Sequence, residues 1–369
     1  MTQPVRPVLE AGSPSCGHIS VLSGLDQLAN SWDQLAAGSG SPMQQYAWGS
    51  ACAETLSRPS ELHLVVVGPL QRPVAIAPLI RRQGELPRLE LLGLRELHEP
   101  MDFVYREAAD VAMLAEAVAQ LGLPLFLERV PAESLTVSAV KHVYGGSGVV
   151  ICRPAPGWPS LVLDRRWAQS EPPIEAGRRS DLRRARRHAE RIGQVTCEAV
   201  SPAPTELDRL LDEVFRVEAA SWKGRRGTAL ASDPVRGAFY RRYAVAACRA
   251  GVLRLCFLRV GDRVAAVQFA IESDERFSLL KIGYDEAFAR CSPGMLLMEE
   301  TIRDAAKRGL RSYEFLGTAE PWTRVWTGRV RPCVSVRAYP LRRWGLAALT
   351  ADVAQTGWRK LGHLFGVAR

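Results

Sequence analysis

Residues 277–326 read FSLLKIGYDEAFARCSPGMLLMEETIRDAAKRGLRSYEFLGTAEPWTRVW. The apolar first segment predicts a strand, which leads through a loop to Pro293-Gly294 at the start of a long helix. A helix N-terminus presents N–H groups and a partial positive charge, so it favours an anion such as pyrophosphate. Arg290 lies just upstream and can add a charge-assisted contact. The same pattern also fits a plain helix cap at Ser292, so the spacing alone leaves both interpretations open.

The two halves of the chain predict helices and strands in a similar order. The C-terminal half predicts helices at 178–192, 206–222, 235–250 and 293–308, and strands at 194–200, 253–260, 264–272, 277–284, 312–316 and 330–339. The N-terminal half predicts helices at 25–35, 43–56 and 109–121, and strands at 62–67, 74–80, 86–92 and 123–130. Each half therefore contains helices, an antiparallel meander, a helix and a strand, which predicts an α/β fold that occurs twice.

A segment rich in proline, residues 153–177, separates the two halves and predicts the domain boundary. We therefore expect a loosely packed N-terminus at 1–17, one domain at 18–158, a second domain at 159–340 and a helical tail at 341–369. In each domain we expect a mixed, mostly antiparallel sheet flanked by helices.

The composition limits the class of protein. The chain has 369 residues, of which 47% are hydrophobic and 24% charged, so it predicts two globular domains. A net charge of +9 favours an anionic partner, which includes nucleic acid, a membrane surface or a phosphorylated cofactor. We find no signal peptide and no apolar stretch long enough to span a membrane, and the eight cysteines show neither C-x-x-C pairs nor metal-site spacing. We expect a cytoplasmic protein with reduced thiols and no metal site.

The central segment resembles the CelD/BcsL family, acetyltransferase-like proteins associated with cellulose biosynthesis. The residues that carry the resemblance are Tyr284, Asp285, Phe288, Ala289, Ser292, Pro293, Gly294, Leu296, Leu297, Gly309, Tyr313, Phe315, Gly317 and Trp326. Further similar segments are the basic helix 183–193, the step Ser221-Trp222-Lys223-Gly224, and the less specific segments around Pro42–Trp48 and Asp102-Phe103.

The resemblance implies two GNAT-like domains, an arrangement shared with FemAB-type transferases. It also implies an acyl-CoA donor, expected to be acetyl-CoA, and an amine or hydroxyl acceptor. In this superfamily the strand before the pyrophosphate loop splays from its neighbour to admit pantetheine. Carried over, backbone groups of Ile282, Gly283 and Tyr284 contact pantetheine, and the pyrophosphate is held by Arg290, Ser292, Pro293, Gly294 and Met295.

Two features depart from the expected pattern. The superfamily loop R/Q-x-x-G-x-G/A is not met, because Arg290 is followed by Cys-Ser-Pro-Gly-Met. The family has a lysine where this chain has Thr323, so Arg324 would have to make that contact.

Acyl transfer to an amine requires a base. Glu314 is the first candidate, because partial burial beside the acyl site would raise its pKa. Its alternative role is a structural ion pair with an arginine. Asp285 and Glu320 are second candidates, although each also fits a turn or cap. Contacts with the acceptor are expected from Lys281, Trp322, Arg324 and Trp222.

The helix Arg178–Arg191 is rich in arginine and has three interpretations. It is either a solvated face, or a site for an anionic acceptor, a carrier protein or a membrane surface, or a nucleic-acid site. The last is not favoured, because no aromatic residues are interleaved. Three functions remain: an acyl-CoA-dependent transferase with a small-molecule, saccharide or cell-envelope acceptor; a FemAB-like transferase that uses aminoacyl-tRNA; and a non-catalytic accessory protein of polysaccharide biosynthesis.

Overall fold

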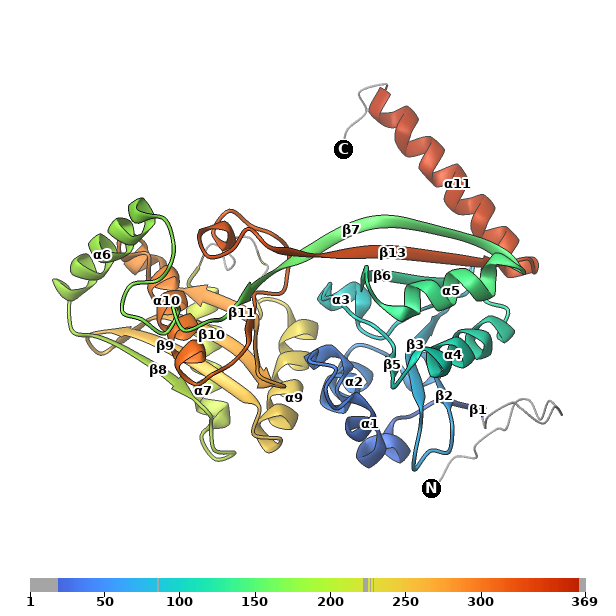
Figure 1. Ribbon diagram of the computed structural model, residues 1–369, viewed down its shortest axis with the longest axis horizontal. Coiled ribbons are helices and arrows are strands. Elements are labelled where there is room, and N and C mark those ends of the chain that lie inside the picture. Colours follow the sequence, from blue (N-terminus) through green and yellow to red (C-terminus); the bar gives the residue numbers. More distant parts are fainter. Residues whose placement is uncertain (1–18, 85, 222–224, 226, 228, 365–369) are drawn as a thin grey trace.

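The computed structural model describes residues 19–84, 86–221, 225, 227 and 229–364. Its strands form one mixed, mostly antiparallel sheet that runs through the whole molecule, with helices on both faces (Figure 1). The strand order is β1-β2-β3-β4-β6-β13-β7-β12-β11-β10-β9-β8, and β5 pairs with β3 beside this path. The predicted α/β fold class is confirmed.

The N-terminal half is built around strands that are buried on both faces. Its strands are β1 (Ile19–Leu22), β2 (Leu62–Val67), β3 (Ala75–Arg82), β4 (Arg88–Leu91), β5 (Val104–Tyr105) and β6 (Leu125–Pro131). Its helices are η1 (Asp26–Leu28), α1 (Ala29–Ala36), η2 (Pro42–Gln44), α2 (Tyr46–Thr55), η3 (Pro59–Glu61), α3 (Leu94–Leu97), α4 (Ala108–Gln120) and α5 (Leu135–Gly145). Because α4 packs against β2 and β3, their continuous apolar runs are hidden from water.

The C-terminal half carries the segment that decides the fold. Its helices are α6 (Ala176–Glu190), α7 (Leu207–Ala219), α9 (Pro234–Arg249), η4 (Glu286–Cys291), α10 (Pro293–Lys307) and η5 (Thr323–Val325). Its strands are β8 (Val195–Val200), β9 (Leu253–Val260), β10 (Arg263–Ser273), β11 (Arg276–Tyr284) and β12 (Ser312–Glu314). Helix α10 contacts α6 and strands β9 to β11, and α7 packs on β10 and β11 through Gly283, on the face opposite the α10 core.

Two long strands join the halves, β7 (Gly148–Val162) and β13 (Val330–Pro340) (Figure 1). β7 pairs with β13 along residues 148–159 and with β12 along 160–162. The proline-rich segment at 153–177, in which the domain boundary is expected, is therefore strand over its first part. Residues 148–159 of β7 pair with a strand along one edge only, and prolines are tolerated in strands that leave an edge unpaired.

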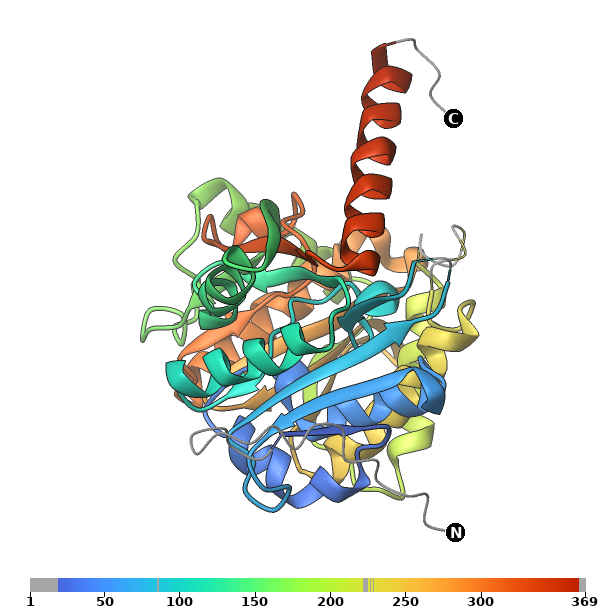
Figure 2. The same ribbon diagram turned by 90° about the vertical axis from the view of Figure 1, so that its right-hand side faces the viewer.

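The strand β13 pairs across the expected domain division. The sequence places residues 330–340 in the C-terminal unit, whereas β13 pairs with β6 and β7 in the sheet of the N-terminal half. Helix α11 (Arg343–Leu364) begins just after β13 and projects away from the body of the molecule (Figure 2). Its base is held by Asp352, which accepts hydrogen bonds from Tyr339 and Arg337. None of the helices in the described ranges is both long and apolar enough to cross a membrane.

Buried contacts fix the two halves against each other. The Trp48 ring on α2 lies 4.9 Å from that of Phe239 on α9. Arg129, which is 8% exposed, donates hydrogen bonds to the backbone carbonyls of His98, Pro156 and Gly317. These carbonyls belong to the N-terminal half, to β7 and to the loop after β12. One buried guanidinium therefore ties three segments together at the junction.

Candidate functional site

Strands β11 and β12 are parallel neighbours that separate after a short pairing. The pairing covers Arg276–Ser278 against Ser312–Glu314. Beyond it, β11 has a bulge at Leu280, where its register with β10 shifts. The chain after β12 turns away through Leu316 and Gly317, both with positive φ. The divergence corresponds to the splayed strands that the family resemblance implies.

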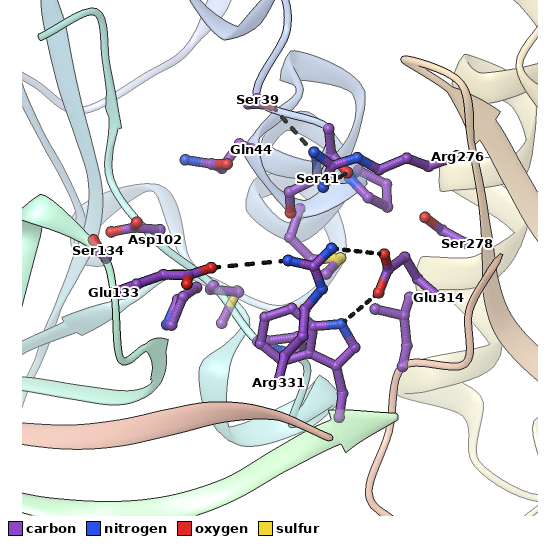
Figure 3. A pocket seen from close by; sticks show the side chains of 18 of the residues that line it. Ser39, Ser41, Gln44, Asp102, Glu133, Ser134, Arg276, Ser278, Glu314 and Arg331 are labelled. Atoms are coloured by element: carbon purple, nitrogen blue, oxygen red, sulfur yellow. Dashed lines mark hydrogen bonds and ion pairs between the residues drawn. The ribbon is translucent and has the colours of Figure 1, made fainter. Parts of the chain in front are cut away.

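A cavity of about 320 Å³ lies between the halves at the start of this divergence (Figure 3). Both halves and β7 contribute to its wall. The lining residues with polar or charged side chains are Ser39, Ser41, Gln44, Asp102, Tyr105, Glu133, Ser134, Trp158, Arg276, Ser278, Glu314 and Arg331. We call this cavity the interdomain pocket.

Glu314 lies in the wall of the interdomain pocket and is 3% exposed. Its Oε1 accepts hydrogen bonds from Ser312 (2.9 Å) and Ser160 (3.3 Å), and pairs with the Arg331 guanidinium at 3.2 Å. Its Oε2 accepts the indole N–H of Trp158 at 2.9 Å. The carboxylate is therefore surrounded by donors, as the ion-pair alternative expects.

Asp102 is a second carboxylate in the interdomain pocket, and sequence reasoning did not select it as a catalytic candidate. Burial raises its pKa to about 6, although hydrogen bonds from Ser134, Thr136 and the Phe103 backbone oppose the shift. Its Oδ1 accepts the Thr136 hydroxyl at 2.6 Å and the Phe103 N–H at 2.8 Å. The only sequence signal was the similarity around Asp102-Phe103. A carboxyl group with this pKa can exchange a proton near neutral pH.

A second cavity of about 570 Å³ lies at the N-terminus of α10, and we call it the cationic pocket. The sequence-predicted residues Arg290, Ser292 and Met295 line it. Ser292 precedes α10 in the left-handed conformation, and its hydroxyl makes no capping hydrogen bond. Pro293 has no N–H, and the Met295 N–H donates to the Ser292 carbonyl at 2.9 Å, so Gly294 carries the first-turn N–H of α10 that can donate to an anion.

The opposite wall of the cationic pocket is the basic helix α6. It contributes Arg178, Asp181, Arg184, His188 and Arg191 among other residues. Asp181 is the one carboxylate in this lining, and it pairs with Arg178 and Arg184.

Two guanidinium groups of the cationic pocket remain without a carboxylate. Within the described ranges, neither Arg191 nor Arg290 forms an ion pair. The structure therefore brings together two features that the sequence presented separately, the basic helix and the Pro293 helix start, and leaves the pocket with excess positive charge.

The strand residues expected at pantetheine have distinct surroundings. A Cβ on Gly283 would lie 2.7 Å from the Cα of Glu218, so this glycine is required for close packing of α7 on the sheet. A Cβ on Gly294 would meet Tyr284 and Ile282 at 3.8 and 3.9 Å, which is ordinary contact. Gly294, Ile282 and Tyr284 thus lie together where α10 starts beside the diverging part of β11.

The other expected residues lie outside the walls of both pockets. Asp285 caps η4 by accepting the Ala287 N–H at 2.9 Å, and it pairs with Arg263 at 2.9 Å. The Lys281 ammonium lies 5.0 Å from the centre of the Tyr240 ring.

The remaining candidates follow β12. Trp322 packs edge-on against Phe315 at 6.1 Å, Arg324 is exposed, and Glu320 accepts a hydrogen bond from Thr318 at 3.4 Å. Trp222 lies outside the described residues. No group of three or more metal-ligating side chains occurs in the part of the chain that the structure describes.

Comparisons with known proteins agree with this geometry. Residues 176–324 match the sequence model of the acetyltransferase (GNAT) domain. A solved structure of the C-terminal domain (DUF2156) of a protein described as a lysylphosphatidylglycerol synthetase, from Agrobacterium fabrum, is similar with a TM-score of 0.55 and 12% identity, covering 89% of this chain and 97% of that chain. FemX is similar with a TM-score of 0.55 and 10% identity, covering 85% and 96%. No curated protein sequence matches this chain. At these identities the structural likeness concerns the fold alone, and the acetyltransferase (GNAT) description comes from the match over residues 176–324.

Proposed function

We propose that this protein transfers an acyl group, in the first instance acetyl, from acyl-CoA to an amine or hydroxyl of a small-molecule, saccharide or cell-envelope acceptor. One observation carries the proposal: strands β11 and β12 diverge at an interdomain pocket that holds a carboxyl group of raised pKa, and a cationic pocket lies at the start of α10, the helix that follows β11. The donor's phosphates then lie in the cationic pocket, and its thioester lies at the interdomain pocket.

The cationic pocket suits the phosphates of CoA. The start of α10 supplies the backbone N–H of Gly294, and Arg290 and Arg191 supply charges that no carboxylate neutralises within the described ranges. The basic character of α6 therefore serves the donor in this proposal, and nucleic acid is not needed to explain it.

In this proposal Glu314 acts on the site through Arg331. Its two oxygens are occupied by donors from Ser160, Ser312, Trp158 and Arg331. A carboxylate held in this way keeps a guanidinium and an indole in place at the pocket wall, and it has little freedom to accept a substrate proton.

Membership of the CelD/BcsL family and a role in polysaccharide biosynthesis are part of the proposal, supported by the residues of the central segment. A cytoplasmic location is also proposed. It is supported by the seven described cysteines, all of which are free thiols.

Thermal unfolding with acetyl-CoA and longer acyl-CoAs tests the donor. A ligand at 100 times its Kd stabilises a protein by about 2.7 kcal/mol. For 369 residues unfolding as one unit, that raises Tm by roughly 3 to 4 °C. Replacing both Arg191 and Arg290 by Gln removes two charge-assisted contacts, so the affinity should fall by at least about 100-fold and the shift to under about 1 °C. Arg165→Gln, an exposed change outside both pockets, is the matched control and should keep the full shift.

The same experiment separates the alternatives. No shift with any acyl-CoA, together with no thiol release in the presence of amines, would overturn the proposal. Salt-sensitive binding of tRNA in place of acyl-CoA would favour aminoacyl-tRNA-dependent transfer, because phosphate contacts weaken steeply with salt. Binding of neither would favour the non-catalytic accessory role.

A further inference from the structure

Arg276 is a cation of the interdomain pocket that lacks a carboxylate partner among the described residues. It begins β11 and is partly exposed in the pocket wall. Its Nη1 donates to the Gly40 carbonyl at 3.5 Å, and the Gly40 N–H in turn donates to Asp274 at 3.2 Å. A Cβ on Gly40 would lie 2.3 Å from the Arg276 Cζ, so the absence of a side chain there lets the guanidinium approach the backbone closely. The charge is thus held in place and not neutralised.

The other guanidinium of the pocket, that of Arg331, forms ion pairs with carboxylates. Arg331 pairs with Glu314 at 3.2 Å and with Glu133 at 3.8 Å. Of the charged side chains that line the pocket, only Arg276 and Asp102 therefore remain outside this ion-pair group. Figure 3 shows them on opposite sides of the pocket, Arg276 from the C-terminal half and Asp102 from the N-terminal half.

These two groups differ in what they can bind. A fixed guanidinium binds a carboxylate or phosphate through charge-assisted hydrogen bonds. Asp102 accepts hydrogen bonds from Thr136 and the Phe103 backbone on Oδ1, and Ser134 also hydrogen-bonds to its carboxyl group. These partners are neutral, so an ammonium group is the natural charged partner for this carboxylate.

We propose that the acceptor is a small molecule with both a primary amine and an anionic group, in which Arg276 binds the anion and Asp102 receives the proton of the amine. This inference rests on the proposed function. Asp102 takes one proton from the ammonium, and the amine lone pair forms the new C–N bond at the thioester carbonyl. The C–S bond breaks with its electron pair going to sulfur, and the second amine proton leaves to solvent as CoA departs as a thiolate.

The size of the interdomain pocket agrees with a small acceptor. Its volume of about 320 Å³ is at the lower end of the range of roughly 300–1,000 Å³ that is typical of small-molecule sites. A molecule the size of an amino acid or an amino sugar phosphate fits such a volume.

Pairs of amines that differ only in the anionic group test this inference. Suitable pairs are glucosamine with glucosamine 6-phosphate, ethanolamine with phosphoethanolamine, and phenethylamine with phenylalanine. Binding of each compound to the full chain is measured by calorimetry, without a donor, and thiol release from acetyl-CoA is measured separately. At least one anionic member should bind about 10- to 100-fold tighter than its neutral partner, which is the range of one charge-assisted hydrogen bond.

Arg276→Gln should abolish that preference, Arg276→Lys should retain part of it, and Arg165→Gln should leave it unchanged. Equal binding within every pair, or no binding by any member, would overturn the inference even if acyl-CoA binds. A preference that depends on Arg276, without any acyl-CoA turnover, would support the acceptor class and overturn the donor part of the proposed function. The pairwise preference of the wild-type protein is informative even if a variant does not fold.

Discussion

Replacing Glu314 by Gln separates a structural role from a direct catalytic one. All the groups around the carboxylate are donors: the Ser160 and Ser312 hydroxyls, the Trp158 indole N–H and the Arg331 guanidinium. The new amide can place its oxygen at Oε1, but its NH₂ group then faces the Trp158 N–H. One buried donor loses its acceptor, and the ion pair with Arg331 loses its negative partner.

The cost follows from these contacts. An unsatisfied buried donor costs about 1–3 kcal/mol, and a hydrogen bond to a charged group contributes about 1.5–3 kcal/mol. Arg331 keeps some compensation, because its side chain is 24% exposed and Glu133 lies 3.8 Å away. We therefore expect Glu314→Gln to lower the free energy of unfolding by about 2–4 kcal/mol.

Urea unfolding measures this loss, with the slope m unchanged if the folded state stays compact. A double-mutant cycle with Arg331→Met isolates the ion pair, and we expect a coupling energy of about 1–3 kcal/mol. The turnover of the folded variant should keep the pH profile of the wild type. A variant that unfolds within about 0.5 kcal/mol of the wild type, yet loses activity about 1,000-fold, would refute this reasoning and make Glu314 the base.

Three further predictions concern packing, pH and the junction. Gly283→Ala should lower the free energy of unfolding, measured in urea, by about 1–3 kcal/mol because its Cβ would lie 2.7 Å from the Cα of Glu218. The control Gly294→Ala should change it by under about 1 kcal/mol. Equal effects of the two changes would contradict the close packing of α7. The pKa of Asp102 is raised to about 6, so its contribution to stability is present below its unfolded pKa and is lost as pH rises through about 6. Relative to Asp102→Asn, the free energy of unfolding of the wild type should fall by about 1 kcal/mol between pH 5 and pH 7.5. A difference that stays constant with pH would speak against the raised pKa. Arg129→Met leaves three carbonyl groups without their donor and should cost at least about 3 kcal/mol by thermal or urea unfolding, unless the junction is looser than the contacts indicate.

Local patterns predicted much of the C-terminal half. The strand at 253–260 has the predicted bounds, and α10 begins at Pro293 as expected. These elements depend on signals within the segment itself: the Gly261-Asp262 turn, the proline in the first helical turn, and apolar periodicity.

Prediction failed where an element depends on a distant partner. The prolines of β7 indicate a linker when seen alone, and the strand persists because β13 pairs with it from almost two hundred residues further along the chain. Helix α5 is only weakly indicated by the sequence, because it mixes β-branched residues with helix formers.

The site divides in the same way. The start of α10 and Arg290 were visible as a local anion motif, but nothing local indicated that α6 would form the facing wall. The interdomain pocket was not predictable, because its wall combines short loops of the N-terminal half with β7, β11 and β12. Asp102 and Arg276 carry little local signal of a site, because they come to line one pocket only when the two halves are assembled.

The exchange of β13 into the N-terminal sheet also determines when this protein can finish folding on the ribosome. About 200 residues separate the end of β6 from the start of β13, which corresponds to roughly 10–40 s of translation. During that time the nascent N-terminal half has β6 as an open edge, and an open edge can pair with another chain. The edge of the N-terminal sheet is therefore covered only when β13 emerges late in translation. Before that, the nascent chain is most exposed to pairing with other chains.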